Sequence, residues 1–98
     1  MKLVFASAAS REAVEARTWY DQRREGLGEE FQRAFQATAE ALLLHPEMYQ
    51  VAYKSRRRAF IRRFPYFLLY EVVGDAIIIL GCIHMARNPA VWRRRGDA

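Results

Sequence analysis

Residues 56–73, which read RRRAFIRRFPYFLLYEVV, decide the fold. Apolar and charged residues alternate over Ala59–Phe64, Pro65 interrupts the pattern, and the apolar run Tyr66–Val73 follows. A period of two is typical of a strand, and proline belongs at a bend because it cannot donate in a central ladder. We therefore predict two strands, Ala59–Phe64 and Tyr66–Val73, with a bend at Pro65. The first would place Phe60, Arg62 and Phe64 on one face and Ala59, Ile61 and Arg63 on the other.

The chain on the C-terminal side of this stretch adds a third strand. Gly74-Asp75 separates two apolar runs, which is a signal for a tight hairpin turn. Ala76–Met85 is almost entirely apolar, so this strand is predicted to be central and covered on both faces. Asn88-Pro89 ends it, and the last residues, VWRRRGDA, form a short basic tail.

The N-terminal side is predicted to contain one strand and two helices. Lys2–Ala6 is a short β-prone run, and Ser7 is the expected N-cap of the first helix. The apolar stripe of this helix consists of Ala9, Ala13, Ala16 and Tyr20.

A second helix follows the glycines of EGLGEE and forms a helical hairpin with the first. It begins near Gly28 and ends at His45-Pro46, because a residue before proline avoids the α region. Its stripe consists of Leu27, Phe31, Ala34, Phe35, Thr38, Ala41 and Leu42. Pro46–Ser55 is predicted to be irregular.

The elements therefore follow the order β-α-α-β-β-β: an N-terminal strand, a helical hairpin and a three-stranded antiparallel meander. The helices must bury their apolar stripes on one face of the sheet, which gives an α+β fold of two layers. With 98 residues, of which 52% are hydrophobic, the chain fits one domain, residues 1–98.

Positive charge is concentrated in the second half of the chain. Residues 1–53 hold six Lys/Arg against eight Asp/Glu, whereas residues 54–98 hold ten against three, so the two parts carry net charges of −2 and +7. This asymmetry favours one basic binding surface, although a solvated basic face fits the same counts.

The sequence predicts no cofactor, metal or membrane segment. Cys82 is the only cysteine, which excludes an internal disulfide and fits a cytoplasmic protein, and its apolar surroundings predict a buried thiol. The longest apolar stretch is too short to span a membrane, and there is no signal peptide, phosphate-binding loop or Cys/His cluster.

The arginines are the residues best suited to binding, because a guanidinium donates paired hydrogen bonds to phosphate or carboxylate. The predicted binding surface consists of Lys54, Arg56, Arg57, Arg58, Trp92, Arg93 and Arg94. Aromatic rings beside the arginines would stack on bases, a common device in RNA recognition. Phe60, Phe64, Phe67 and Tyr70 are expected in the core instead.

His84 is the candidate for acid–base chemistry. It stands at the end of the third strand of the meander, three residues before Arg87. Histidine titrates near neutral pH, and RNA cleavage by the 2′-hydroxyl needs a base, an acid and a cation for the developing charge. In a nuclease, His84 would be the acid or base, and Arg62, Arg63 and Arg87 would hold the phosphate. The alternative is a structural histidine at a strand end.

These motifs and their order resemble the RelE/ParE superfamily of bacterial toxins. The likeness covers nearly the whole chain and rests on WYDQRREGLGEEFQRAFQATAEALLLHPEMYQ, RRAFIRRFPYFLLYEV and the apolar strand that runs into IHMARNPAVW. The resemblance implies the toxin of a type II toxin–antitoxin module (a plasmid stabilisation protein), with a cognate antitoxin that binds and silences it.

The superfamily has two recorded activities. RelE-like members cleave mRNA on the ribosome without a metal, using basic residues and a C-terminal tyrosine or histidine, whereas ParE-like members block DNA gyrase. The positions here that match the basic and acid–base residues are Arg62, Arg63, His84 and Arg87. The RelE lysine pair is reduced to Lys54, however, and Trp92 replaces the catalytic tyrosine. The I-H-x-x-x-N pattern at 83–88 also resembles the ParE branch.

We therefore expect a growth inhibitor of the ParE branch that acts on gyrase. The alternatives are a ribosome-dependent mRNA endonuclease and a non-toxic basic module that only binds RNA.

Overall fold

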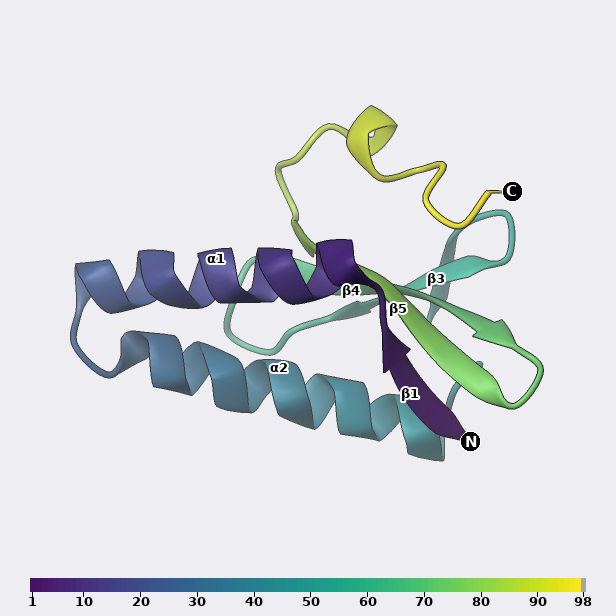
Figure 1. Cartoon of the computed structure of the whole chain (residues 1–98), viewed down its shortest axis with the longest axis horizontal. Coiled ribbons are helices and arrows are strands. Elements are labelled where there is room, and N and C mark those ends of the chain that lie inside the picture. Colours follow the sequence, from purple (N-terminus) through teal and green to yellow (C-terminus); the bar gives the residue numbers. More distant parts are fainter. Residues whose placement is uncertain (98) are drawn as a thin grey trace.

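The computed structural model describes residues 1–97, in which a helical hairpin packs on one face of a five-stranded sheet (Figure 1). The elements are β1 (Lys2–Phe5), α1 (Ser7–Arg23), α2 (Leu27–Leu44), β2 (Gln50–Tyr53), β3 (Arg56–Phe60), β4 (Tyr66–Val73), β5 (Ala76–His84) and the 3-10 helix η1 (Pro89–Val91). The strands lie in the order β1-β5-β4-β3-β2. β1 is parallel to β5, and all other neighbours are antiparallel. The predicted α+β class and element order are confirmed, with one more strand in the sheet.

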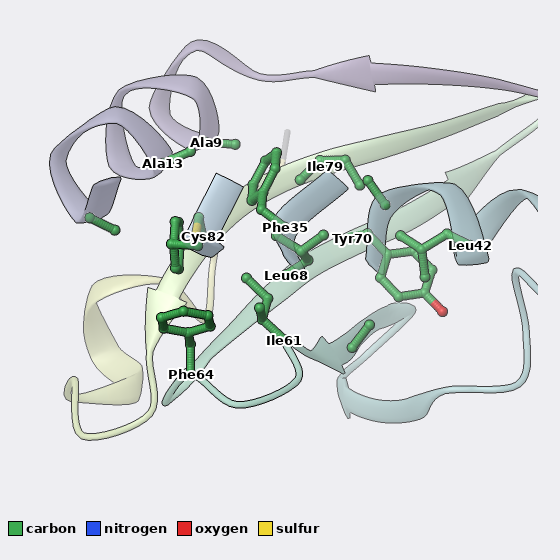
Figure 2. Close-up of a cluster of buried hydrophobic side chains, with 14 of the residues drawn as sticks. Ala9, Ala13, Phe35, Leu42, Ile61, Phe64, Leu68, Tyr70, Ile79 and Cys82 are labelled. Atoms are coloured by element: carbon green, nitrogen blue, oxygen red, sulfur yellow. The ribbon is translucent and has the colours of Figure 1, made fainter. Parts of the chain in front are cut away.

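The main core lies between the hairpin and the sheet (Figure 2). Ala9 and Ala13 of α1 and Phe35 of α2 are buried against Leu68 and Ile79 of the sheet. The small alanines allow α1 to pack closely, and each fully buried large apolar side chain contributes about 1.5–3 kcal/mol. Within the described residues, no helix is long and apolar enough to cross a membrane.

The start of α1 differs from the prediction. Its N-cap is Ala6, not Ser7, and no side chain caps the helix. The backbone N–H of Ala6 donates to the carbonyl of Ile79 at 2.9 Å, so pairing with β5 holds this residue extended and sets where the helix begins. The other end follows the prediction, because Gly26, with a φ of 88°, turns the chain from α1 into α2.

The predicted strand Ala59–Phe64 is wrong in its bounds, since β3 begins three residues earlier and ends four residues earlier. The backbone N–H of Ile61 donates to the carbonyl of Tyr66 at 2.9 Å, and this bond closes a turn over residues 61–65. Arg63 has a φ of 74°, which no regular strand allows. Arg62 and Arg63 therefore lie in the β3–β4 turn rather than on alternate faces of a strand.

The stretch Pro46–Ser55, predicted to be irregular, contains β2, which pairs antiparallel with β3. A short turn at Lys54, with a φ of 52°, joins the two strands. Four residues are too few for an alternating pattern to stand out in the sequence, which explains why β2 was missed.

The hairpin between β4 and β5 follows the prediction, with its turn at Gly74-Asp75. Leu69 pairs with Gly81 and Tyr70 with Ile79, so Leu80 is an extra residue that forms a β-bulge. Apolar side chains cover β5 on both faces, as predicted: Ile79 packs under the helices, whereas Ile83 belongs to a second cluster on the other face.

Candidate functional site

The helix-free face of the sheet is covered by the C-terminal segment Asn88–Asp97, which we call the strap. In Figure 1 it is the yellow segment that runs from the end of β5 past α1 toward β3. Trp92 of the strap packs edge-on against Phe67, with ring centroids 5.3 Å apart, and Leu69 and Ile83 complete the cluster. The indole of Trp92 is only 5% exposed. Trp92, predicted to lie on a binding surface, is thus packed against the sheet in this structure.

Glu12 of α1 is the centre of a charge cluster at the edge of β5. Arg95 of the strap donates to both carboxylate oxygens, at 2.7 Å from Nη1 and 2.8 Å from Nη2. Arg87 Nη1 donates at 3.0 Å and the backbone N–H of Cys82 at 3.1 Å. β1 ends before this point of β5, and Arg95 Nη1 also donates to the carbonyl of Leu80 at 3.3 Å. The Glu12–Arg95 pair therefore satisfies backbone groups that a neighbouring strand would otherwise bind.

The charge cluster fixes the protonation states of its members. Burial alone would raise the pKa of Glu12, but the hydrogen bonds from Arg95 and Cys82 and the charges of Arg95 and Arg87 outweigh it and lower the pKa. The hydrogen bond to Glu12 raises the pKa of Arg95. Burial, with a smaller contribution from the charge of Glu12, raises the pKa of Cys82 to about 12. Cys82 is thus a buried, protonated thiol, as predicted.

Sequence reasoning missed Glu12. The available signal was its position: a carboxylate lies within the alanine stripe of α1, directly before Ala13, where a polar side chain must find partners on the sheet side.

Arg56 was predicted as part of the binding surface and is buried instead, with 3% of its surface exposed. Its Nη2 donates to Asp97 of the strap, and its Nε lies 3.9 Å from the Glu71 carboxylate. Lys54 Nζ lies 3.8 Å from Asp97. The hydrogen bond from Arg56, together with the nearby positive charges, lowers the pKa of Asp97. Arg56 therefore holds the strap, and it is too deeply buried to present its donors to an external anion.

The next two arginines of β3 point to opposite faces. Arg57 donates to the carbonyl of Tyr49 at 2.7 Å and so holds the loop before β2. Arg58 lies on the strap side, over the rings of Phe60 and Phe67 at 5.4 and 5.8 Å from their centroids. Phe60, predicted in the core, is 46% exposed, because it packs with Phe67 on the strap side of the sheet, away from the helices.

Exposed positive charges lie on the strap and in the β3–β4 turn. Arg93 and Arg94 are exposed, and the guanidinium of Arg93 stands over the Tyr53 ring at 5.5 Å. Arg62 and Arg63 are exposed and line a groove of about 620 Å³ against α2, where Arg63 pairs with Glu30 at 3.2 Å.

His84 is exposed at the end of β5. Its Nδ1 accepts the backbone N–H of Ala86 at 3.0 Å, and its ring meets Tyr66 edge-on at 5.1 Å. His84 and Arg87 line one shallow pocket beside Glu12, whereas Arg62 and Arg63 line the separate groove against α2. The structure thus brings together two of the four residues assigned to a nuclease site. Among residues 1–97, no three His, Cys, Asp or Glu side chains are grouped to hold a metal ion.

Comparison with known proteins identifies this scaffold. A solved structure described as "Chromosomal ParDE TA system from P. aeruginosa" is similar to the chain, with 18% identity and a TM-score of 0.66, over 86% of this chain and 95% of that one. At this identity the likeness establishes the fold, which is that of RelE/ParE toxins. The family described as "ParE toxin of type II toxin-antitoxin system, parDE" matches residues 3–89. A comparison with curated proteins gave no match.

The chain belongs to the ParE toxin family. It is therefore the toxin component of a type II toxin–antitoxin module, whose partner is a cognate antitoxin.

Proposed function

We propose that this protein inhibits bacterial growth by acting on DNA gyrase and that its cognate antitoxin neutralises it. The observation that carries the proposal is the separation of the residues that a metal-free nuclease would need to gather. Arg87 is bound to Glu12 and Arg63 to Glu30, on different helices. Trp92, at the position of the RelE tyrosine, is buried and has no acidic proton to donate.

The accessible arginines suit a protein partner. Arg93 and Arg94 stand on the strap, and their planar guanidinium groups can pair with carboxylates of a gyrase surface. An antitoxin that carries acidic residues would compete for the same charges. Both interactions are expected to weaken as salt concentration rises, because exposed charges are screened.

A supercoiling assay with purified toxin and gyrase tests the proposal. Excess toxin is expected to stop supercoiling, and cognate antitoxin to restore it. The double variant Arg93→Glu/Arg94→Glu should lose most of the inhibition, because the carboxylates would repel acidic groups on gyrase. The matched control is Arg11→Glu/Arg17→Glu, which makes the same change in net charge on α1. Undiminished supercoiling at excess folded toxin, or equal loss in both double variants, would contradict the proposal.

A second candidate function is cleavage of mRNA on the ribosome, and the pocket shared by His84 and Arg87 favours it. In this reading His84 is the acid or base and Arg87 stabilises the phosphate charge. Pulse labelling after induction separates the two functions, since protein synthesis would fall first for a ribosomal target and DNA synthesis first for gyrase. His84→Gln should abolish toxicity only in the nuclease case. Expression with no growth defect would indicate a module that binds RNA without toxicity.

A further inference from the structure

We propose that the strap Asn88–Asp97 is a lid with two states, which is closed in this structure and opens as a unit to expose the helix-free face of the sheet. The first observation concerns its backbone. Within the described residues, each backbone-to-backbone hydrogen bond of the strap stays inside the strap, such as Trp92 to Pro89, Arg95 to Trp92 and Asp97 to Arg94. The strap is therefore attached to the sheet by side chains alone, and no backbone hydrogen bond to a strand has to break when the strap opens.

The second observation is that both anchors of the strap have a substitute partner. Glu12 binds Arg95 of the strap, but it also binds Arg87, which precedes the strap and is not part of it. Arg56 binds Asp97 of the strap, with Glu71 of β4 beside it. A buried charge left without a partner usually makes such an opening prohibitive. When the strap opens, however, the carboxylate of Glu12 and the guanidinium of Arg56 each keep a counter-charge.

The third observation is the fit between strap and sheet. Gly81 lies under the strap, and a Cβ there would stand 2.6 Å from Arg95 Nη1. Gly96, with a φ of 90°, brings the end of the strap against Leu80 and Arg56. The indole Nε1 of Trp92 is buried in the closed state, and no acceptor among residues 1–97 meets it. This unsatisfied donor regains water when the strap opens, which favours the open state.

Opening would uncover Phe67, Leu69 and Ile83, flanked by Arg58. The closed strap therefore separates a charged outer surface, with Arg93 and Arg94, from an apolar inner one. This inference concerns the fold and does not depend on the cellular target.

Fluorescence of Trp92 tests the proposal directly. The chain has two tryptophans, so Trp19→Phe leaves Trp92 as the only reporter. In this background Trp92 should be shielded from acrylamide. Glu12→Gln is expected to raise the open fraction roughly tenfold, because a charge-assisted hydrogen bond becomes a neutral one. Gly81→Ala should open the strap without changing any charge. Glu15→Gln, one turn along α1 at an exposed position, is the matched control and should leave Trp92 shielded.

The expected result is that quenching of Trp92 rises in both strap variants while helical circular dichroism stays as in the control. The proposal would be overturned if quenching of Trp92 by acrylamide rises only when the helical circular dichroism is also lost. Hydrogen exchange on the unmodified protein covers the case in which the variants do not fold. The indole N–H of Trp92, which is buried in the closed state, should exchange through an opening that depends on denaturant less steeply than the exchange of Leu68 and Ile79 in the core, because less surface is exposed. One common opening for strap and core would also overturn the proposal.

Discussion

At the scale of single residues, Arg63 has a backbone conformation that is unfavourable for any residue other than glycine. Its φ of 74° lies in the left-handed region, which costs a non-glycine residue about 1–2 kcal/mol. Its ion pair with Glu30 is open to solvent, with 67% of the Arg63 side chain and 31% of the Glu30 side chain exposed, and pairs of this kind contribute about 0–1 kcal/mol. Stability alone therefore does not account for arginine at this position.

Arg63→Gly is accordingly expected to be at least as stable as the original protein. The neighbouring change Arg62→Gly is the matched control and should lower the free energy of unfolding by about 0.5–1 kcal/mol, because glycine only adds freedom to the unfolded chain there. Urea unfolding of the two variants measures the difference. Equal losses in both would show that the left-handed backbone at Arg63 carries no strain.

At the scale of elements, the joint between α1 and α2 depends on Gly28. A Cβ at this position would stand 2.5 Å from the backbone carbonyl of Arg17 and 3.0 Å from Asp21, whose carboxylate accepts the Gly28 N–H at 3.1 Å. Gly28→Ala should therefore push the two helices apart and lower the free energy of unfolding by about 1–3 kcal/mol.

Gly26→Ala separates this steric effect from the general cost of replacing a glycine in the hairpin. Gly26 has open space around it, so alanine there meets only the left-handed backbone, at about 1–2 kcal/mol. Thermal unfolding of both variants checks the ranking. A Gly28→Ala variant as stable as Gly26→Ala would mean that the helices can separate without loss of packing.

The elements also show how far sequence reasoning reaches. The two helices could be predicted because an apolar stripe recurs at helical spacing along each of them, over helices of 17 and 18 residues. β2 could not, because four residues carry little pattern, and the end of β3 was misplaced because the alternation runs on through a turn. The basic character of the tail could be predicted from its composition. The packing of Trp92 on the sheet and the ion pair between Glu12 and Arg95, however, bring together residues that lie far apart in the sequence. No local pattern encodes such contacts.

At the scale of the whole molecule, the charge cluster around Glu12 makes stability depend on pH. The pKa of Glu12 in the folded protein lies below its ordinary value of 4.5. The folded state therefore binds this proton less readily than the unfolded chain does. The resulting stabilisation is complete above about pH 4.5 and is lost as the pH falls through the folded pKa.

Chemical unfolding measured from pH 7 to pH 3 should show this loss below about pH 4.5. In Glu12→Gln the slope of stability against pH should be smaller in that range, since one shifted carboxyl is gone. Glu15→Gln should keep the slope of the original protein. Parallel curves for all three proteins would assign the acid sensitivity to other carboxyl groups, such as Asp97, whose pKa is also lowered.

The parallel pairing of β1 with β5 also affects how the chain folds during its synthesis. The first strand and Glu12 find their partners in β5 and Arg95, 74 or more residues later along the chain. Contacts at such separation close late, because the long intervening loop must be ordered first. While the ribosome is still adding residues, the growing chain has an unpaired strand and a lone carboxylate among alanines. The surface built from these contacts therefore exists only once the ribosome has added β5 and Arg95.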